Sequence, residues 1–434
     1  MDKKFGGAAW ISTTEAKAWQ SMKCAAPKGR ETHLEVTDTG HQTWRGFGGC
    51  FNELGWIALS KTSADRKKRI LDELFDARTG CGFTFCRVPI GASDYAAEWY
   101  SHNETDGDYA MKHFSIARDR LHLLPYIKEG LKRQPAMKFF ASPWSPPTWM
   151  KFPKTFNYGK LIRTKENLQA YALYFSKFVQ AYRKEGVVIN QIHVQNEPVA
   201  DQKFASCLWT GSEMRDFVRD YLGPRFRKDK LDCEIWIGTL NTDDYTNYVH
   251  IPLSDAKARQ YICGIGLQWT GKGAAQRTNE AWPEVPMMQT ENECGDGRNT
   301  WDYAQYVFGL MQHYINNGVV GYMYWNMILE PTGRSTWGWT QNSMITVDPA
   351  DGKVTMNPEF WVMKHFAHFV KPGAVRLGLV GRWQPFSVAF ENTDGSRALV
   401  MNNPLDSAQN IMITHPEGGF SANLPPRSFN TFVM

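Results

Sequence analysis

Two stretches of the chain, Gln191-Ile-His-Val-Gln-Asn-Glu-Pro198 and Met287-Met-Gln-Thr-Glu-Asn-Glu-Cys294, each carry an apolar-rich run that stops at a carboxylate. Both runs have the length and composition of a buried strand. The first places Asn196 and Glu197 at the end of its strand, and the second places Glu291 there. The carboxyl ends of parallel strands in a barrel meet at one mouth. We therefore expect Glu197 and Glu291 to face each other across such a mouth.

Strand and helix patterns alternate on both sides of these stretches. Strand character is found at 45–51, 82–90, 137–142, 191–197, 234–240, 261–269, 287–291 and 319–326. Helical periodicity is found at 63–75, 116–131, 165–184, 212–222 and 301–316. Repeated strand–helix units with nearly continuous apolar strands predict a parallel sheet, and eight units predict a (β/α)8 TIM barrel. An open doubly wound sheet is disfavoured, because no GxGxxG opens a helix after the first strand.

The character of the chain changes after about Phe369. Short strand-like runs at 376–380, 386–390, 398–401, 411–414 and 428–433 are separated by turn residues, with no helical pattern between them. They predict a small β-sandwich, which the strand-like run 32–37 would help to complete. The predicted organisation is therefore an N-terminal segment, 1–44, that adds strands to the β-sandwich, a catalytic barrel, 45–369, and a flanking β-sandwich, 370–434.

The bulk properties of the chain exclude several classes of protein. Its 434 residues have a net charge of +5 and 21% charged residues, without a long basic block, so no nucleic-acid partner is expected. No window approaches 18 uninterrupted apolar residues, so no membrane span is expected. Residues 1–10 lack the apolar segment of a signal peptide. The location stays open between the cytoplasm and secretion with the signal already removed.

Neither a metal nor a cofactor is expected from the sequence. No Cys/His cluster has the spacing of a zinc site. The glycine-rich run 45–50 lacks the Lys-Ser/Thr pair of a phosphate-binding P-loop, so we interpret its glycines as positions of tight turning or close backbone approach. The remaining candidates for chemistry are carboxylates and aromatic rings.

Paired carboxylates are the groups that cleave glycosidic bonds. One must be protonated to help the leaving oxygen depart, and in the retaining mechanism a second must be ionised to attack the anomeric carbon. Pro198 favours an extended backbone at Glu197 and ends the strand there. Glu293 shares a face with Glu291 on an extended chain, so spacing alone leaves the nucleophile open between these two.

Several neighbours of the glutamates have side chains that suit this chemistry. Arg87 would support an anion, with a structural ion pair as the alternative, and Asp94 or Asn196 could bond sugar hydroxyls. Flat aromatic faces stack on sugar rings, although tryptophan is by default a core residue. The tryptophans close to the candidate sites are Trp144, Trp149, Trp209, Trp269, Trp325, Trp337 and Trp339.

Taken together, these residues resemble glycoside hydrolase family 30, in particular its glucosylceramidases and related bacterial exo-β-glycosidases. The resemblance runs from Gly46-Phe-Gly-Gly-Cys-Phe-Asn52 to Val375-Arg-Leu-Gly-Leu-Val380, with Arg87-Val-Pro, Ala141-Ser-Pro-Trp-Ser-Pro-Pro-Thr-Trp149, Asn196-Glu-Pro198, Thr290-Glu291 and Trp325-Asn326 between them. It implies a barrel with a flanking β-sandwich and a retaining mechanism, with Glu197 as the acid/base and Glu291 as the nucleophile. The residues that it places at the sugar or the nucleophile are Asn196, Arg87, Asp94, Trp144, Trp269 and Trp325.

The chain departs from the glucosylceramidase pattern at three positions. Gln268 stands where those enzymes have His, Thr270 where they have Tyr, and Glu330 where they have an Asn near the sugar. Specificity for ceramide therefore does not carry over, and β-glucose, β-fucose, β-xylose and β-galactose all stay open as the sugar.

We therefore expect a retaining exo-β-glycosidase that acts on β-glucosides or related β-linked sugars, since the Trp325 region implies an exo-acting pocket. An endo-β-1,6-glucanase of the same family is the first alternative. A catalytically silent carbohydrate-binding barrel is the second, and the presence of both Glu197 and Glu291 argues against it. The expected partner is a carbohydrate, and the sequence does not indicate an oligomeric state.

Overall fold

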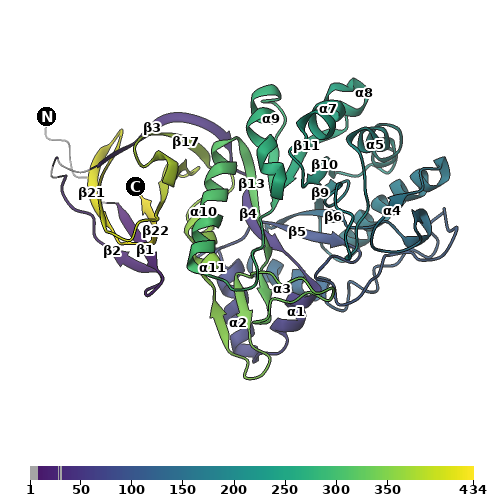
Figure 1. Cartoon of the computed structure of the whole chain (residues 1–434), viewed down its shortest axis with the longest axis horizontal. Coiled ribbons are helices and arrows are strands. Elements are labelled where there is room, and N and C mark those ends of the chain that lie inside the picture. Colours follow the sequence, from purple (N-terminus) through teal and green to yellow (C-terminus); the bar gives the residue numbers. More distant parts are fainter. Residues whose placement is uncertain (1–7, 28, 30–31) are drawn as a thin grey trace.

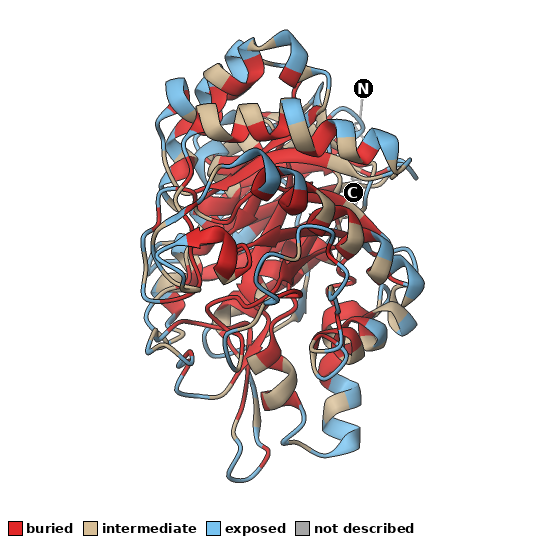
Figure 2. Ribbon diagram, turned by 90° about the vertical axis from the view of Figure 1, so that its right-hand side faces the viewer, coloured by how far each residue is buried: buried red, intermediate tan, exposed pale blue. Residues whose placement is uncertain are grey.

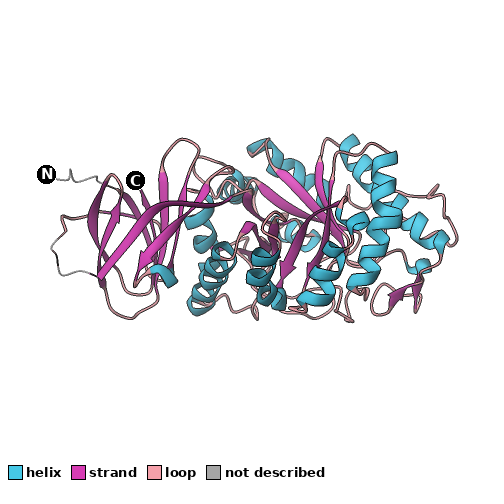
Figure 3. Cartoon of the chain, turned by 90° about the horizontal axis from the view of Figure 1, so that it is seen from above, coloured by secondary structure: helices cyan, strands magenta, loops and turns pink. Residues whose placement is uncertain are grey.

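The computed structural model describes residues 8–27, 29 and 32–434, so residues 1–7, 28, 30 and 31 of the predicted N-terminal segment lie outside the described part. The chain forms two adjoining bodies, which Figures 1 and 3 show side by side. One is a closed barrel of strands wrapped by helices, and the other is built from a single large sheet of β-strands. The first and last strands of the chain both belong to the large sheet.

Eight parallel strands close the barrel, which confirms the predicted fold class. In order around it they are β4 (Gly46–Cys50), β5 (Phe85–Ile90), β6 (Lys138–Pro143), β9 (Ile189–His193), β10 (Glu234–Leu240), β11 (Ile262–Gln268), β12 (Met287–Glu291) and β13 (Val319–Asn326). Gly48 permits the close approach of β4 to β5, since a Cβ there would lie 1.7 Å from the carbonyl oxygen of Phe85. The glycine at position 48 therefore allows two neighbouring barrel strands to pack closely.

Helices cover the outside of the barrel and connect its strands. The longer ones are α2 (Ala64–Phe75), α3 (Leu123–Arg133), α4 (Lys165–Lys184), α10 (Trp301–Asn316) and α11 (Pro358–Ala367); the shorter ones are α1 (Glu53–Leu59), α5 (Gly211–Phe217), α6 (Gly223–Lys228), α7 (Ile251–Ser254), α8 (Ala256–Arg259) and α9 (Ala275–Ala281). The side chains of Ser63, Thr164 and Thr300 cap α2, α4 and α10 by accepting a backbone N–H bond. These caps explain why the predicted starts of those helices are close to the observed ones.

Helix α3 starts later than the sequence pattern suggested. We predicted a helix over 116–131, but residues 117–122 form turns and the helix begins at Leu123. Pro125 accounts for the difference, because proline lacks the N–H of a helix interior and is tolerated only in the first turn. The helix therefore has to begin just before it.

The large sheet is the β-sandwich, and it takes strands from both ends of the chain. Its order is β2-β1-β22-β19-β18-β17-β3-β20-β21. The bounds are β1 (Ala9–Thr14), β2 (Gln20–Met22), β3 (Thr32–Thr43), β17 (Val375–Gly381), β18 (Ser387–Glu391), β19 (Arg397–Asn403), β20 (Gln409–His415), β21 (Gly418–Leu424) and β22 (Ser428–Val433). The sequence pattern missed β21, because its run Gly-Gly-Phe-Ser-Ala-Asn-Leu has no β-branched residue.

Helices α10 and α11 lie between the barrel and the β-sandwich (Figure 1). His365 on α11 pairs with the hydroxyls of Thr13 on β1 and Thr431 on β22, at 2.9 and 2.8 Å. Trp301 on α10 stacks on Phe429 of β22, with ring centroids 4.8 Å apart. The contact between the two bodies is thus both apolar and hydrogen-bonded.

The inside of the barrel is a packed core and not a channel. Buried side chains from five strands form one cluster, consisting of Phe85, Phe140, Trp236, Met288, Val320 and Met323. Figure 2 shows that burial is concentrated along the barrel strands. Arg87 follows Phe85 by two residues on β5, so it shares the inward face one layer nearer the carboxyl ends. The packed layer thereby supports the charged groups above it.

Short strand pairs complete the loops at the carboxyl ends of the barrel strands. They are β7 (Lys151–Phe152) with β8 (Lys160–Leu161), and β14 (Ile328–Leu329) with β15 (Ile345–Val347) and β16 (Val354–Met356). The residues between β14 and β15 form a long loop, which we call the β14 loop (residues 330–344).

Candidate active site

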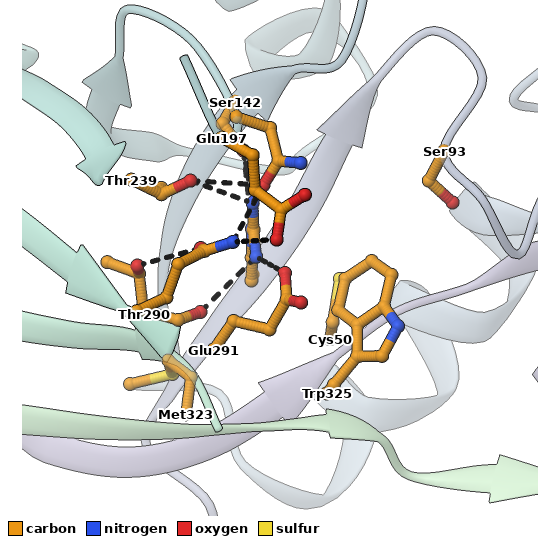
Figure 4. A network of polar contacts seen from close by, with 12 residues as sticks. Cys50, Ser93, Ser142, Glu197, Thr239, Thr290, Glu291, Met323 and Trp325 are labelled. Atoms are coloured by element: carbon orange, nitrogen blue, oxygen red, sulfur yellow. Dashed lines mark hydrogen bonds and ion pairs between the residues drawn. The ribbon is translucent and has the colours of Figure 1, made fainter. Parts of the chain in front are cut away.

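Glu197 and Glu291 meet at the carboxyl-end mouth of the barrel, as the sequence led us to expect. Glu291 is the last residue of β12, and Glu197 follows β9. Figure 4 shows both carboxyl groups within one network of polar contacts, with Ser142 and Thr239 beside them. In essentially every TIM-barrel enzyme, this face carries the catalytic residues.

Glu291 is buried and receives one hydrogen bond on each carboxylate oxygen. Arg87 Nη1 lies 2.6 Å from Oε2, and the indole Nε1–H of Trp269 donates to Oε1 at 3.0 Å. Burial raises the pKa of Glu291, whereas the charge of Arg87 and the hydrogen bond from Trp269 lower it. The cation and the indole thus favour the ionised form of this carboxyl group.

Arg87 is fully buried and organises the floor of the site. Its Nη2 donates to Asn196 Oδ1 at 2.6 Å and to Ser142 Oγ at 2.9 Å. Its guanidinium carbon lies 4.5 Å from the ring centroid of Trp144 and 5.3 Å from that of Trp325. A cation held over two aromatic faces is stabilised without a second carboxylate, so the charge of Arg87 is directed to Glu291.

Asn196 is oriented by the bonds that its carbonyl oxygen accepts. Oδ1 takes hydrogen bonds from Arg87 Nη2 and from Thr239 Oγ1, the latter at 3.0 Å. The side chain lines the cavity described below. With the carbonyl oxygen occupied, the amide NH2 is the group that Asn196 can offer to a ligand.

The backbone of Glu197 is not extended, so this part of the sequence prediction is wrong. Its φ is +45°, in the left-handed region that a non-glycine residue rarely adopts. The Glu197 N–H donates to Thr239 O at 3.1 Å, and its carbonyl oxygen accepts from Ala200 N at 2.9 Å. These bonds turn the chain sharply after Asn196 and override the preference that a following proline imposes. Strain of this kind is concentrated at functional sites.

The carboxyl group of Glu197 is also buried, but it lacks the direct contact with a cation that Glu291 has. Its partner is the neutral amide of Gln268, whose Nε2 donates to Oε1 at 3.1 Å. Burial, together with the negative charge of Glu291, raises the pKa of Glu197 to about 8. Two buried carboxyl groups of which only one is paired with a cation are typical of an acid and its anionic partner.

A cavity of about 480 Å³ opens above these groups. It is lined by Asp94, Trp144, Asn196, Glu197, Val199, Ala200, Gln202, Phe204, Asn241, Trp269, Thr270, Glu291, Gly295, Trp339, Thr340 and Gln341. Asp94 is buried, and its Oδ1 has no protein partner. Burial and the charges of Glu291 and Glu197 raise the pKa of Asp94 well above its usual range. A buried oxygen that no protein group satisfies is suited to a ligand hydroxyl.

Four of the predicted site residues are not among those that line this cavity, namely Arg87, Gln268, Trp325 and Glu330. Gln268 lies beneath it and connects Glu197 to Thr290, whose Oγ1 donates to Gln268 Oε1 at 3.2 Å. Trp325 backs Trp144, with ring centroids 5.3 Å apart. Glu330 is half-buried at the start of the β14 loop, so its contact with the sugar stays a prediction.

Glu293 is separated from the site by partners of its own. Lys272 Nζ forms an ion pair with Glu293 Oε1, and the Tyr306 hydroxyl donates to Oε2 at 2.6 Å. Its side chain does not line the cavity. Of the two acids that spacing left open, only Glu291 has its carboxyl group at the mouth.

Sequence reasoning missed most of the cavity wall contributed by the loop after Glu197. Val199, Ala200, Gln202 and Phe204 line it, together with Asn241 after β10. These are ordinary loop residues with no motif of their own. The one signal that could have indicated them is position, because residues that follow a catalytic strand end lie at the barrel mouth.

Within residues 8–27, 29 and 32–434, no group of three or more His, Cys, Asp or Glu side chains is placed to hold a metal ion. Among the helices of the same residues, none has both the length and the apolar character needed to cross a bilayer.

A TIM barrel with two carboxyl groups over a buried arginine at its mouth defines the class of barrel hydrolases. Residues 44–370 match the family model of the glycosyl hydrolase family 30 TIM-barrel domain, and residues 373–432 match that of the family's β-sandwich domain. The chain therefore belongs to glycoside hydrolase family 30, and it is a glycoside hydrolase.

The similar proteins differ in the substrates that their names give. Putative glucosylceramidase 1 of Caenorhabditis elegans is 30% identical over 91% of this chain and 81% of its own length. The crystal structure of SrfJ from Salmonella typhimurium superposes with a TM-score of 0.91 at 25% identity, and it covers 99% of each chain. The endo-β1,6-glucanase BT3312 superposes with a TM-score of 0.89 at 26% identity, again covering 99% of each chain.

Proposed function

We propose that this protein is a retaining exo-β-glycosidase that removes glucose, or a related β-linked sugar, from the end of its substrate. Glu291 is the nucleophile and Glu197 the acid/base in this proposal. The observation that carries it is the contrast between the two carboxyl groups. Glu291 is held by Arg87 and the Trp269 indole, while Glu197 has only a neutral amide partner and a pKa raised to about 8.

The reaction then follows from where the proton and the charge lie. Glu197, protonated at neutral pH, gives its proton to the glycosidic oxygen while Glu291 attacks the anomeric carbon. The leaving group departs, and a covalent glycosyl–Glu291 ester remains. Glu197, now ionised, takes a proton from a water molecule that attacks the same carbon and releases the sugar with its β-configuration retained.

The loop contacts at the mouth of the cavity favour the exo assignment. The β14 loop reaches from β14 to two other loops at the mouth. Trp337 stacks on Trp99 of the loop after β5, with ring centroids 5.7 Å apart. Trp339 packs against Phe204 of the loop after β9, with ring centroids 6.1 Å apart. The Trp337–Trp99 contact involves the same loop that holds Asp94, so it limits how far a chain can extend beyond the sugar bound beside Asp94.

Hydrolysis of a panel of nitrophenyl β-glycosides tests the activity and identifies the sugar. We expect the β-glucoside, β-fucoside, β-xyloside or β-galactoside to be cleaved, and NMR to show the β-anomer as the first product. An α-anomer formed first would refute retention. No cleavage of any of the four would favour the silent barrel.

An endo-β-1,6-glucanase is the second candidate, since this chain superposes on BT3312 with a TM-score of 0.89. Size analysis of the products from a long β-1,6-glucan separates the two. Single sugars released from the start of the reaction support the exo assignment, whereas a ladder of shorter chains supports the endo-glucanase.

A further inference from the structure

The part of the cavity next to Glu197 is lined by a different segment of the chain from the part next to Asp94 and Trp144. Asp94 and Trp144 belong to the segments after β5 and β6, whereas Val199, Gln202 and Phe204 belong to the segment that directly follows Glu197. An acid must lie within hydrogen-bond reach of the oxygen that it protonates. The leaving group of the substrate therefore lies along the wall that follows Glu197.

Trp339 brings an aromatic ring to this wall. It lines the cavity, and its ring meets Phe204 at an interplanar angle of 61°. Its indole Nε1–H is buried and has no protein partner. A buried donor left without a partner costs stability, and a hydroxyl from a ligand would satisfy it.

Lys203 adds an unpaired cation above the same ring. Its Nζ lies 4.8 Å from the ring centroid of Trp339. Lys203 is exposed, and no carboxylate in the described part of the chain forms an ion pair with it. Its three N–H donors are thus available to a group that rests beside Trp339.

Beside the apolar Val199, Ala200 and Phe204, the lining of this region has five polar, uncharged side chains. They are the amides and hydroxyls of Gln202, Asn241, Thr270, Thr340 and Gln341. Asn241 Oδ1 accepts a bond from Val199 N at 3.4 Å, which leaves its NH2 group for a ligand. A hydrocarbon chain placed here would leave these groups without partners, whereas a hydroxylated ring would satisfy them.

We propose that Trp339, Lys203 and Asn241 form a leaving-group subsite that takes a sugar ring. The ring stacks on Trp339, and its hydroxyls bond the Lys203 ammonium and the Asn241 amide. The natural substrate is then a β-linked disaccharide or the end of an oligosaccharide, and not a glycolipid. This inference rests on the proposed function, because it assigns the leaving group of the same reaction.

Three substrates that share the same glycone distinguish the contribution of the subsite to kcat/KM from that of the catalytic groups. A β-glycosyl fluoride has a one-atom leaving group, a β-linked disaccharide has a sugar, and a hexyl β-glycoside has a hydrocarbon. We expect Trp339→Ala to lower the ratio of kcat/KM for disaccharide over fluoride by roughly 10- to 200-fold, the range for a contact in a specificity pocket. The ratio for hexyl glycoside over fluoride should fall by less than about threefold, because the hydrocarbon has no hydroxyls for this subsite.

Two further variants serve as controls for the effect of Trp339→Ala on the kcat/KM ratio. Trp339→Phe retains an aromatic face but loses the indole N–H, so its loss should be smaller than that of Trp339→Ala. Trp361→Ala removes a half-buried tryptophan of α11 that does not line the cavity, and it should leave the ratio unchanged.

Each outcome bears on a different claim. A wild-type protein that fails to cleave any glycosyl fluoride contradicts the proposed function. Cleavage of the fluoride with an unchanged disaccharide ratio in both Trp339 variants overturns the subsite alone. An equal loss for the hexyl glycoside and the disaccharide would show a general apolar surface, and it would overturn the sugar assignment.

Discussion

The two ends of the barrel each hold a carboxylate with several donors, but the two are arranged differently. At the amino end, Glu234 Oε2 accepts from Arg45 Nη1, Gln191 Nε2 and Trp236 Nε1, at 3.0, 3.0 and 2.8 Å. Its side chain is 40% exposed, whereas that of Glu291 at the carboxyl end is 6% exposed. The same type of group is solvated at one end and enclosed at the other.

The difference shows how one scaffold separates stability from function. The Glu234 cluster is half-exposed, and its Oε2 accepts three donors from the protein. At the mouth, Asp94 Oδ1 and the indole N–H groups of Trp325 and Trp339 are buried without protein partners. Such groups make the folded state less stable. Their retention at the mouth is understandable if a substrate satisfies them.

The largest effect should come from removing the enclosed carboxylate. We expect Glu291→Gln to lower kcat by roughly 10⁴- to 10⁶-fold, the range seen when a catalytic group of a hydrolase is deleted. Glu293→Gln is the matched control, since Glu293 is paired with Lys272 and Tyr306. A 2-fluoro glycoside inactivator followed by peptide mass mapping should label Glu291 in the wild type and in Glu293→Gln. Label on Glu293 would refute the assignment.

The second effect concerns Glu197 and depends on the leaving group. Glu197→Gln should lower the rate on natural glycosides by roughly 10²- to 10⁴-fold. For a substrate with an acidic leaving group, the rate of the glycosylation step should fall much less in this variant, because that group departs without a proton. Added azide should then yield a β-glycosyl azide. Wild-type rates on natural glycosides in this variant would exclude Glu197 as the acid.

The pH dependence should separate the same two carboxyls. The acid form of Glu197 is present below its raised pKa of about 8 and is lost as the pH rises through it. The kcat/KM for an unactivated glycoside should therefore fall above about pH 8, and at lower pH as Glu291 takes up a proton. The two apparent pKa values read from such a profile belong to the coupled pair of carboxyl groups and not to either residue alone. A profile that is flat to pH 10 would contradict a protonated Glu197.

Arg87→Met tests how much stability the enclosed ion pair holds. It leaves the Glu291 charge buried without its cation, so we expect the free energy of unfolding to fall by about 3–5 kcal/mol. The double variant Arg87→Met/Glu291→Gln removes both charges and should recover part of that loss. Urea denaturation measures the free energy of unfolding of both variants. A double variant less stable than the single one would contradict the electrostatic explanation.

The smallest effect should come from the solvated end of the barrel. Glu234→Gln keeps an acceptor for its neighbours and removes a half-exposed charge. We expect the free energy of unfolding to change by less than about 1 kcal/mol, as for surface ion pairs, and kcat to stay within twofold. A large loss of kcat would show that the amino end is coupled to the site after all.

The elements that were predicted well are those whose signals are local. The strands 234–240, 287–291 and 319–326 and the helices 165–184 and 301–316 match the observed bounds. Their apolar periodicity and capping residues act within one element. The start of α3 was missed because a proline outweighs the helical pattern, and the strand β21 was missed because its run has no β-branched residue to signal a strand.

The sequence by itself determined the order of most strands and helices, the barrel, and the placing of Glu197 and of the Glu291/Glu293 pair near strand ends, because each rests on periodicity or on a residue that follows an apolar run. Only the tertiary structure decided the rest. The left-handed backbone of Glu197 depends on bonds to β10, and the exclusion of Glu293 depends on Lys272 and Tyr306. The wall beside Glu197 depends on loops that are far apart in sequence. Contacts between distant segments leave no periodic trace in the chain, so they become visible only when the fold brings those segments together.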